Sequence, residues 1–274
     1  MSIKNILVSF NGTDGAARAV RLAAAMARRY DAHLTGVFAH TAPHTRYQFE
    51  AYLTQAALYI MDEGVREAEE QRREEFEEIV GSAEQGVRND FICQSGFPND
   101  VLSRMGRTYD LIVMAQPDGK SSVYDEPRPD DVAMESGRPV LVAPRGFERF
   151  EQSAAAVLAW DGERAASRAL ADAMDLLEDK HRLMVLHVGS DEKVRQPGAS
   201  IMEHLSRHGL EATLNVEKPG GLSTSEIILN ACAETDAGLL VMGAYEHSRV
   251  SEMLLGGVTR DVVARSHIPV LMSH

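Results

Sequence analysis

The chain has 274 residues, which is enough for one large or two small domains that each bury a core. Hydrophobic residues make up 44% and charged residues 25%, as in soluble globular proteins, and the net charge of −13 argues against a nucleic-acid-binding surface. No apolar run approaches the roughly 18 residues of a membrane span, and the N-terminus lacks a signal-peptide pattern. We therefore expect a cytoplasmic protein without membrane or nucleic-acid partners.

The two cysteines, Cys93 and Cys232, fit a reducing compartment and have no metal-binding spacing. We expect both to be buried as small apolar side chains.

The first half alternates short apolar runs with helical patterns. Its predicted strands cover residues 6–10, 34–39, 91–94, 111–114 and 139–142. An alanine-rich helix follows the turn at 11–15, a longer helical stretch covers 45–80, and a short helix covers 98–107 with Asn99 as its predicted N-cap.

The second half repeats this order. Residues 157–162 align with 7–12, residues 184–188 with the strand at 34–39, 240–243 with 112–115, and 268–272 with 138–142. This pattern indicates a tandem duplication. The predicted domains are residues 1–146 and 153–274, and the linker lies around 145–153.

Short strands alternating with helices predict βαβ units and a mostly parallel sheet with helices on both faces. In such sheets ligands bind at the carboxyl ends of the strands. This rule places the turn at Asp161 and the loop after Gly243 at the same edge.

That loop is the strongest candidate site. The apolar run 239–242 stops at Gly243, a polar loop follows, and Gly256 and Gly257 precede a helix predicted to start at Val258. Backbone amides at a helix start, preceded by glycines that allow close approach, favour phosphate binding. Glycines after a strand are also ordinary turn formers, and Asp161 is equally suited to cap the helix that follows it.

Taken together, these residues resemble the universal stress protein family, specifically its tandem two-domain members. The resemblance rests on Asp161-Gly162, His187-Val188, the glycine loop and Pro269 before the last strand. It implies two tandem flavodoxin-like α/β domains, each with a five-stranded parallel sheet flanked by helices. It also implies ATP across the ends of strands one and four. Asp161 and the Val188 backbone would hold the adenosine, and Gly243, Gly256 and Gly257 the ribose and phosphates.

The sequence departs from the family's nucleotide-binding pattern, which is Gly, two residues, Gly, nine residues, Gly, then Ser or Thr. Glu246 stands at the second glycine and Gly257 at the hydroxyl residue. A carboxylate beside phosphates adds repulsion, which a magnesium ion or a basic residue such as Arg249 would offset. In the first half, Asn11 replaces the aspartate and residues 116–120 lack the glycine spacing, so we expect that half to have lost nucleotide binding.

Other patterns have simpler interpretations. His204 and His208 lie one helical turn apart but have no third ligand in view, so we expect no metal there. His33, His40 and His44 are close in sequence, but strand alternation would send the first two to different environments, so we expect no metal there either. The charged run 67–78 is typical of a solvated helix face. His247 and Ser248 have no identifiable base or orienting carboxylate, so we predict no catalytic residue.

The leading hypothesis is a stress-response protein, not an enzyme, whose second domain binds ATP or a related adenine nucleotide, with Mg²⁺ as a companion ion. The alternative is an interaction module that binds no nucleotide; weak ATP hydrolysis would need a positioned water and a base that the sequence does not display. The resemblance also implies pairing of residues 140–142 with 270–272 inside one chain, which gives a pseudo-dimer able to dimerise further. The sequence names no protein partner.

Overall fold

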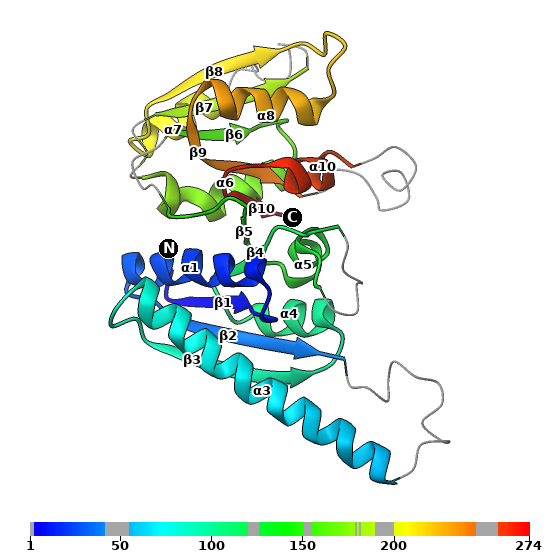
Figure 1. Cartoon of the computed structure of the whole chain (residues 1–274). Coiled ribbons are helices and arrows are strands. Elements are labelled where there is room, and N and C mark those ends of the chain that lie inside the picture. Colours follow the sequence, from blue (N-terminus) through cyan, green and yellow to red (C-terminus); the bar gives the residue numbers. More distant parts are fainter. Residues whose placement is uncertain are drawn as a thin grey trace.

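The computed structural model describes residues 3–41, 55–119, 126–150, 155–178, 180, 182–189, 200–244 and 257–274. Two halves of similar architecture follow one another along the chain and meet in one continuous sheet (Figure 1). Among the described residues, no helix has the length and hydropathy needed to cross a membrane.

The first half confirms the strands predicted there. Its elements are β1 (Asn5–Ser9), α1 (Asp14–Tyr30), β2 (His33–His40), α3 (Gln55–Ala83), β3 (Asn89–Ser95), α4 (Pro98–Gly106), β4 (Leu111–Ala115), α5 (Pro129–Ser136) and β5 (Val140–Ala143). The start of the helical stretch predicted over 45–80 lies partly outside the described residues.

The second half repeats this plan. Its elements are β6 (Ala155–Ala159), α6 (Arg164–Leu177), β7 (Leu183–Val188), α7 (Ile201–Arg207), β8 (Ala212–Glu217), α8 (Thr224–Glu234), β9 (Ala237–Gly243), α10 (Val258–Arg265) and β10 (Val270–Ser273). The start of α10 at Val258 is as predicted, and α7 contains His204 of the pair predicted to lie one helical turn apart, whereas β8 was not located beforehand.

The described strands form a ten-stranded sheet in the order β3-β2-β1-β4-β5-β10-β9-β6-β7-β8. Each half contributes five parallel strands, so the predicted flavodoxin-like arrangement is confirmed. The halves join where β5 and β10 pair antiparallel, with Leu141 opposite Leu271, and these two leucines occupy corresponding positions of the repeat. The predicted intrachain pairing is therefore confirmed, and a pseudo-twofold axis passes between them. Because the halves run antiparallel, their carboxyl edges lie on opposite sides of the sheet.

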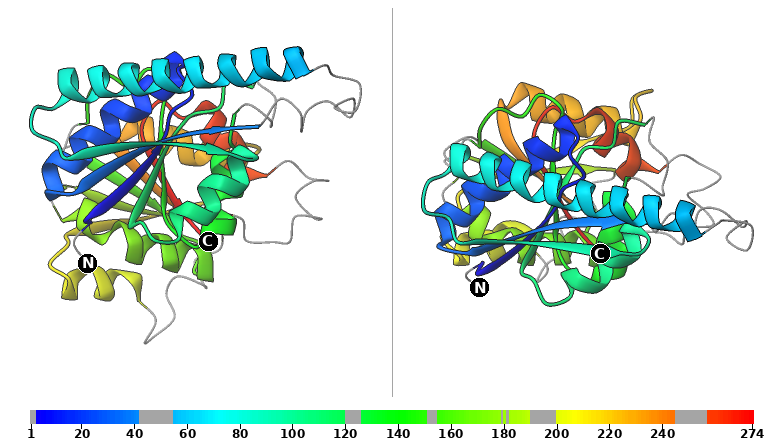
Figure 2. Two further views of the ribbon diagram at one scale, coloured as in Figure 1. Left: turned by 90° about the horizontal axis from the view of Figure 1, so that it is seen from below. Right: turned by 60° about the horizontal axis from the view of Figure 1, so that its bottom comes forward.

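Helices cover both faces of the sheet. Buried residues of α1, α3, α6 and α7 pack on one face, and those of α4, α5, α8 and α10 pack on the other. Figure 2 shows α3 lying across α1 and extending beyond it. Because both faces of the inner strands are buried, their sequences are continuous apolar runs.

The junction between the halves carries an ion pair across the pseudo-twofold axis. Arg260 of α10 places its Nε 2.7 Å from Oδ2 of Asp130 in α5, and Asp130 is 5% exposed. The alignment that matches β5 with β10 also matches Asp130 with Arg260. In a symmetric dimer of identical subunits these positions would carry like charges, whereas duplication within one chain lets them carry opposite charges.

Two local expectations are wrong. Asn99 does not cap α4, whose N-cap is Phe97. Its Oδ1 instead accepts from the Arg128 backbone N–H at 2.8 Å, and its Nδ2 donates to Asp131 at 3.3 Å, which ties α4 to the start of α5. Cys232 is buried as expected, but Cys93 on β3 is only half-buried.

Candidate functional site

Asp161 stabilises the turn after β6 by accepting a backbone hydrogen bond. Its Oδ1 accepts from the Glu163 backbone N–H at 2.8 Å, and Gly162 between them has a φ of +83°, which favours glycine. The first half builds the same turn with Asn11, whose Oδ1 accepts from Thr13 N at 3.2 Å, and with Gly12 at φ +82°. Asparagine therefore serves this turn as well as aspartate. Asp161 does not cap α6, whose N-cap is Glu163.

Gly243 ends β9 directly against the start of α6. A Cβ at Gly243 would lie 2.8 Å from the Ala166 backbone N and 2.9 Å from the Ala165 Cβ, which is too close for any side chain. Helix–strand packing accounts for this glycine by itself, and the contact with a ligand that the sequence suggested stays a prediction. The close contact also brings the start of α6 to the carboxyl edge.

Gly257 is the N-cap residue of α10, with φ −69° and ψ 129°. It offers no side-chain acceptor to the first-turn amides of the helix. These N–H groups and the helix dipole favour an anion at this end. One carboxylate, Asp261, lies in the same turn.

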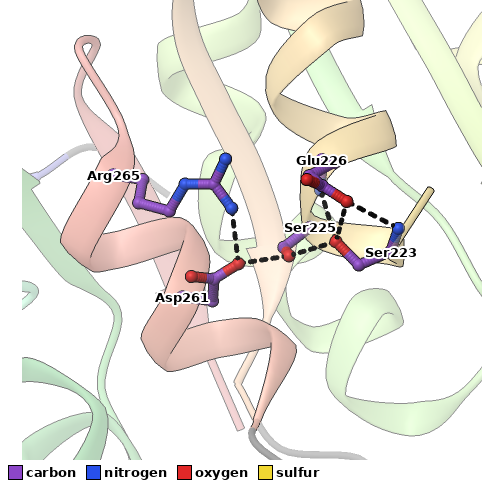
Figure 3. A network of polar contacts seen from close by, with 5 residues as sticks. All are labelled: Ser223, Ser225, Glu226, Asp261 and Arg265. Atoms are coloured by element: carbon purple, nitrogen blue, oxygen red, sulfur yellow. Dashed lines mark hydrogen bonds and ion pairs between the residues drawn. The ribbon is translucent and has the colours of Figure 1, made fainter.

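A polar network holds that turn against α8 (Figure 3). Asp261 accepts a hydrogen bond from Ser225 and pairs with Arg265 at 3.0 Å. At the start of α8, Ser223 and Glu226 form a capping box in which the Ser223 backbone N–H donates to Glu226 at 2.8 Å. These hydrogen bonds from Ser223 lower the pKa of Glu226. The network fixes the direction in which α10 points.

The sheet order brings together part of the predicted site. Strand β6 lies between β7 and β9, so the carboxyl ends of these three strands are neighbours. They bring together Asp161 in the turn after β6, Val188 at the end of β7 and Gly243 at the end of β9. Val188 is the half-buried last residue of β7. Gly257 opens the helix that leads into β10. Gly256, Glu246 and Arg249 lie outside the described residues, together with the rest of the loop from 245 to 256.

The corresponding edge of the first half is filled by the protein's own side chains. A Cβ on Gly12 would lie 2.4 Å from Cζ of Arg72, so this α3 guanidinium rests on the Asn11–Gly12 turn. Arg72 also pairs with Glu75 at 2.6 Å.

After β4, the buried Gln116 donates from Nε2 to the backbone oxygens of Val263 at 2.7 Å and Ser266 at 3.1 Å, at the end of α10. Its Oε1 accepts from Arg145 N at 2.8 Å. Sequence reasoning missed the roles of Arg72 and Gln116. The one sequence feature that could have indicated the role of Gln116 is its place as a polar residue directly after a buried strand. No sequence feature indicated the role of Arg72.

Among the hollows near the second-half strands, two lie beside β6. One of about 450 Å³ is lined by Leu183, Ala212 and Thr235 among others, at the amino ends of β6, β7 and β8. That is the edge opposite the predicted site, where open parallel sheets do not place their ligands. The other, of about 350 Å³, lies between α6 and α7 beside Trp160.

The histidines have partners other than metals. His33 lies 2.9 Å from Asp90 and His40 lies 3.1 Å from Glu69, so the two face different surroundings. The rings of His204 and His208 lie 4.7 Å apart. Within the described part of the chain, no three His, Cys, Asp or Glu side chains are grouped to hold a metal ion. His44 lies outside it.

Comparison with known proteins agrees with this architecture. The model of the universal stress protein family matches residues 2–143 and again residues 155–274. The universal stress protein Slr1230 of Synechocystis is 25% identical over 190 residues; the match covers 65% of this chain and 62% of that protein.

Among solved structures, a universal stress protein from Archaeoglobus fulgidus superposes with a TM-score of 0.73 at 18% identity, covering 97% of this chain and 94% of that one. A functionally unknown protein, PA1789 of Pseudomonas aeruginosa, gives a TM-score of 0.58 at 16% identity, with 98% and 92% covered. At these identities the two structures support the fold alone. The two family matches, one to each half of the duplicated sheet, show that the chain belongs to the universal stress protein family.

Proposed function

We propose that the chain is a stress-response protein whose second domain, residues 153–274, binds ATP or a related adenine nucleotide with Mg²⁺ as its counter-ion. The domain of residues 1–146 serves as its pseudo-dimeric partner and binds none. The observation that carries this proposal is the difference between the two carboxyl edges. Arg72 rests on the turn of the first half, whereas none of the described residues lies within 4 Å of a Cβ placed on Gly162 in the corresponding turn of the second half.

The residues at the second edge suit the proposed ligand. The start of α10 offers backbone N–H groups without a side-chain acceptor from its N-cap, which suits phosphate oxygens. Only Oδ1 of Asp161 is used by the turn, so its other oxygen is suited to accept from an amino or hydroxyl group of a nucleoside. Mg²⁺ would be held mainly by the phosphates and water, as it usually is with nucleotides.

The proposal is tested by unfolding the protein with and without ATP and Mg²⁺. A ligand that binds only the folded state stabilises it by mass action, so ATP should raise the melting temperature and inorganic phosphate should do so less. The absence of any shift at millimolar ATP would overturn the proposal.

Variants at Gly257 separate ligand binding from folding. Gly257→Asp should cap α10, because its φ and ψ suit any residue and aspartate is a favoured N-cap. It should leave the protein without ligand as stable or more stable, while its charge repels phosphate and weakens ATP binding. Gly257→Asn is the matched control, since it caps without adding charge. Equal ATP affinity in both variants would remove the start of α10 from the phosphate site.

The alternative, an interaction module that binds no nucleotide, is favoured by the carboxylate of Asp261 in the first turn of α10. If that charge outweighs the helix amides, Asp261→Asn should create ATP binding that the wild type lacks. If the wild type already binds ATP, the same substitution should strengthen binding only modestly, because Arg265 and Ser225 already offset the charge.

A further inference from the structure

His187 is a buried imidazole at the carboxyl edge of the second domain. It is the second-last residue of β7 and is 3% exposed. Its Nδ1 lies 2.8 Å from the Trp160 carbonyl oxygen. Because a carbonyl only accepts, Nδ1 carries the proton, and in the neutral ring Nε2 is left as a lone-pair acceptor. Nε2 is buried and has no hydrogen-bond partner among the described residues.

An acceptor in this state is costly to bury, so it is expected to have a partner other than the described residues. The ring spans the ends of two neighbouring strands, from Trp160 after β6 to Gly189 after β7. Nε2 lies 3.1 Å from the place where a Cβ on Gly189 would stand. Gly189 therefore places no side chain of its own beside Nε2, on the edge where Asp161 and Val188 lie.

The duplication supplies an internal comparison. Phe10 N donates to Val37 O, and Trp160 N donates to Leu186 O, so the following residues, Phe38 and His187, correspond. The first half thus has an apolar ring in place of the imidazole. In place of Gly189 it has His40, which packs on Phe38 and bonds to Glu69. In the described part of the chain, the acceptor without a partner and the glycine beside it occur together at the edge proposed to bind the nucleotide and are absent from the first-half edge.

We propose that Nε2 of His187 accepts a hydrogen bond from a donor group of the ligand bound at this edge. For an adenine nucleotide that donor is the amino group of the base or a hydroxyl of the ribose. His187 is then a specificity-determining residue that discriminates against ligands without the donor. The inference rests on the proposed nucleotide site and adds a contact that the first domain cannot make.

The test combines two variants with ligands that lack one donor each. His187→Phe copies Phe38, and His187→Asn keeps an N–H for the Trp160 carbonyl while removing the acceptor at Nε2. Binding of ATP, inosine triphosphate, 2′-deoxy-ATP and 3′-deoxy-ATP is measured by calorimetry, and the unfolding of each protein without ligand is measured separately. Phe38→Leu in the first domain is the matched control.

Both His187 variants should bind ATP about three- to tenfold more weakly than the wild type, whereas Phe38→Leu should bind ATP normally. The ligand that lacks the relevant donor should bind the wild type more weakly, yet should lose nothing further in the variants, because the two changes remove the same hydrogen bond. That coupling identifies the donor as base or ribose. The ¹⁵N resonance of Nε2 should also move when ATP is added to the wild type.

Two outcomes overturn the inference and are distinguishable. If the wild type binds ATP and both variants bind it equally well, His187 has no ligand contact and the proposed function stands. If the wild type binds no nucleotide by calorimetry and the Nε2 resonance does not move, the proposed function fails together with the inference.

Discussion

Gly243 and Ala165 are in such close contact that a Cβ on the glycine would lie 2.9 Å from the Cβ of the alanine. In the first half the same contact is made by Ala115 and Gly15, where a Cβ on Gly15 would lie 3.4 Å from that of Ala115. The strand carries the glycine in one half and the helix carries it in the other. The contact between strand and helix thus requires one glycine opposite one alanine, and either element can supply the glycine.

We expect Gly243→Ala to lower the free energy of unfolding by about 1–3 kcal/mol, because its Cβ would overlap the backbone of α6. Ala165→Gly alone should cost about 1 kcal/mol of helix propensity. The double variant, which copies the first half, should lose less than the sum of the two. Urea unfolding of the four proteins measures this coupling, and strict additivity would contradict it. Gly15→Ala is the control and should be neutral or stabilising.

The ion pair between Asp130 and Arg260 should tolerate exchange of its two charges. Asp130→Arg alone places two arginines together across the pseudo-twofold axis, and Arg260→Asp alone places two carboxylates together. Each should cost about 1–3 kcal/mol, a range that allows for the half-exposed arginine. Because the positions correspond, the doubly exchanged variant should recover part of the loss. Chemical denaturation provides the measurement, and a double variant no better than the worse single one would refute the expectation.

The buried hydroxyl of Ser273 is expected to lower the free energy of unfolding relative to an alanine at the same position. Its side chain is 1% exposed, and its Oγ has no partner among the described residues. The corresponding residue of the first half is Ala143, which is buried in the apolar core. We expect Ser273→Ala to raise the free energy of unfolding by about 1 kcal/mol. The mirror variant, Ala143→Ser, should lower it by a similar or larger amount. A destabilised Ser273→Ala would indicate that the hydroxyl has a partner.

Much of the fold could be predicted from the sequence because interior strands of a two-sided sheet are continuous apolar runs, and because each run occurs twice. The edge strand β8 escaped notice because it is only half-buried. Its alternation of Leu214 and Val216 with Thr213 and Asn215 was the available signal.

The site was less predictable, because its chemistry depends on contacts distant in sequence. A glycine that allows a ligand to approach and a glycine that allows a helix to pack look alike in a sequence, and only the structure shows that Gly243 packs against Ala166. The hydrogen bonds of Gln116 reach residues almost 150 positions away.

The two cysteines should differ in reactivity. Burial raises the pKa of the Cys232 thiol to about 12, so almost none of it is thiolate near neutral pH. The pKa of Cys93 is also raised, by burial and by the nearby Glu69, but its side chain is half-buried. Iodoacetamide at pH 8, followed by mass spectrometry, should label Cys93 slowly and Cys232 only when the protein unfolds. Equal labelling of both in the native protein would be inconsistent with the packing of α8.

The capping box of α8 should make stability depend on pH in the acid range. Hydrogen bonds from Ser223 hold the pKa of Glu226 below its ordinary value in the folded protein. A carboxyl with a lowered folded pKa contributes stability above its unfolded pKa, and this contribution is lost as the pH falls through the folded value. Unfolding midpoints measured from pH 7 down to about pH 3 should therefore fall less steeply for Glu226→Gln than for the wild type. Ser223→Ala should flatten the profile only in part, because it removes the hydroxyl donor to the carboxylate and keeps the backbone N–H donor, which lowers the pKa most. Identical slopes in all three proteins would mean that the capping box does not form in solution.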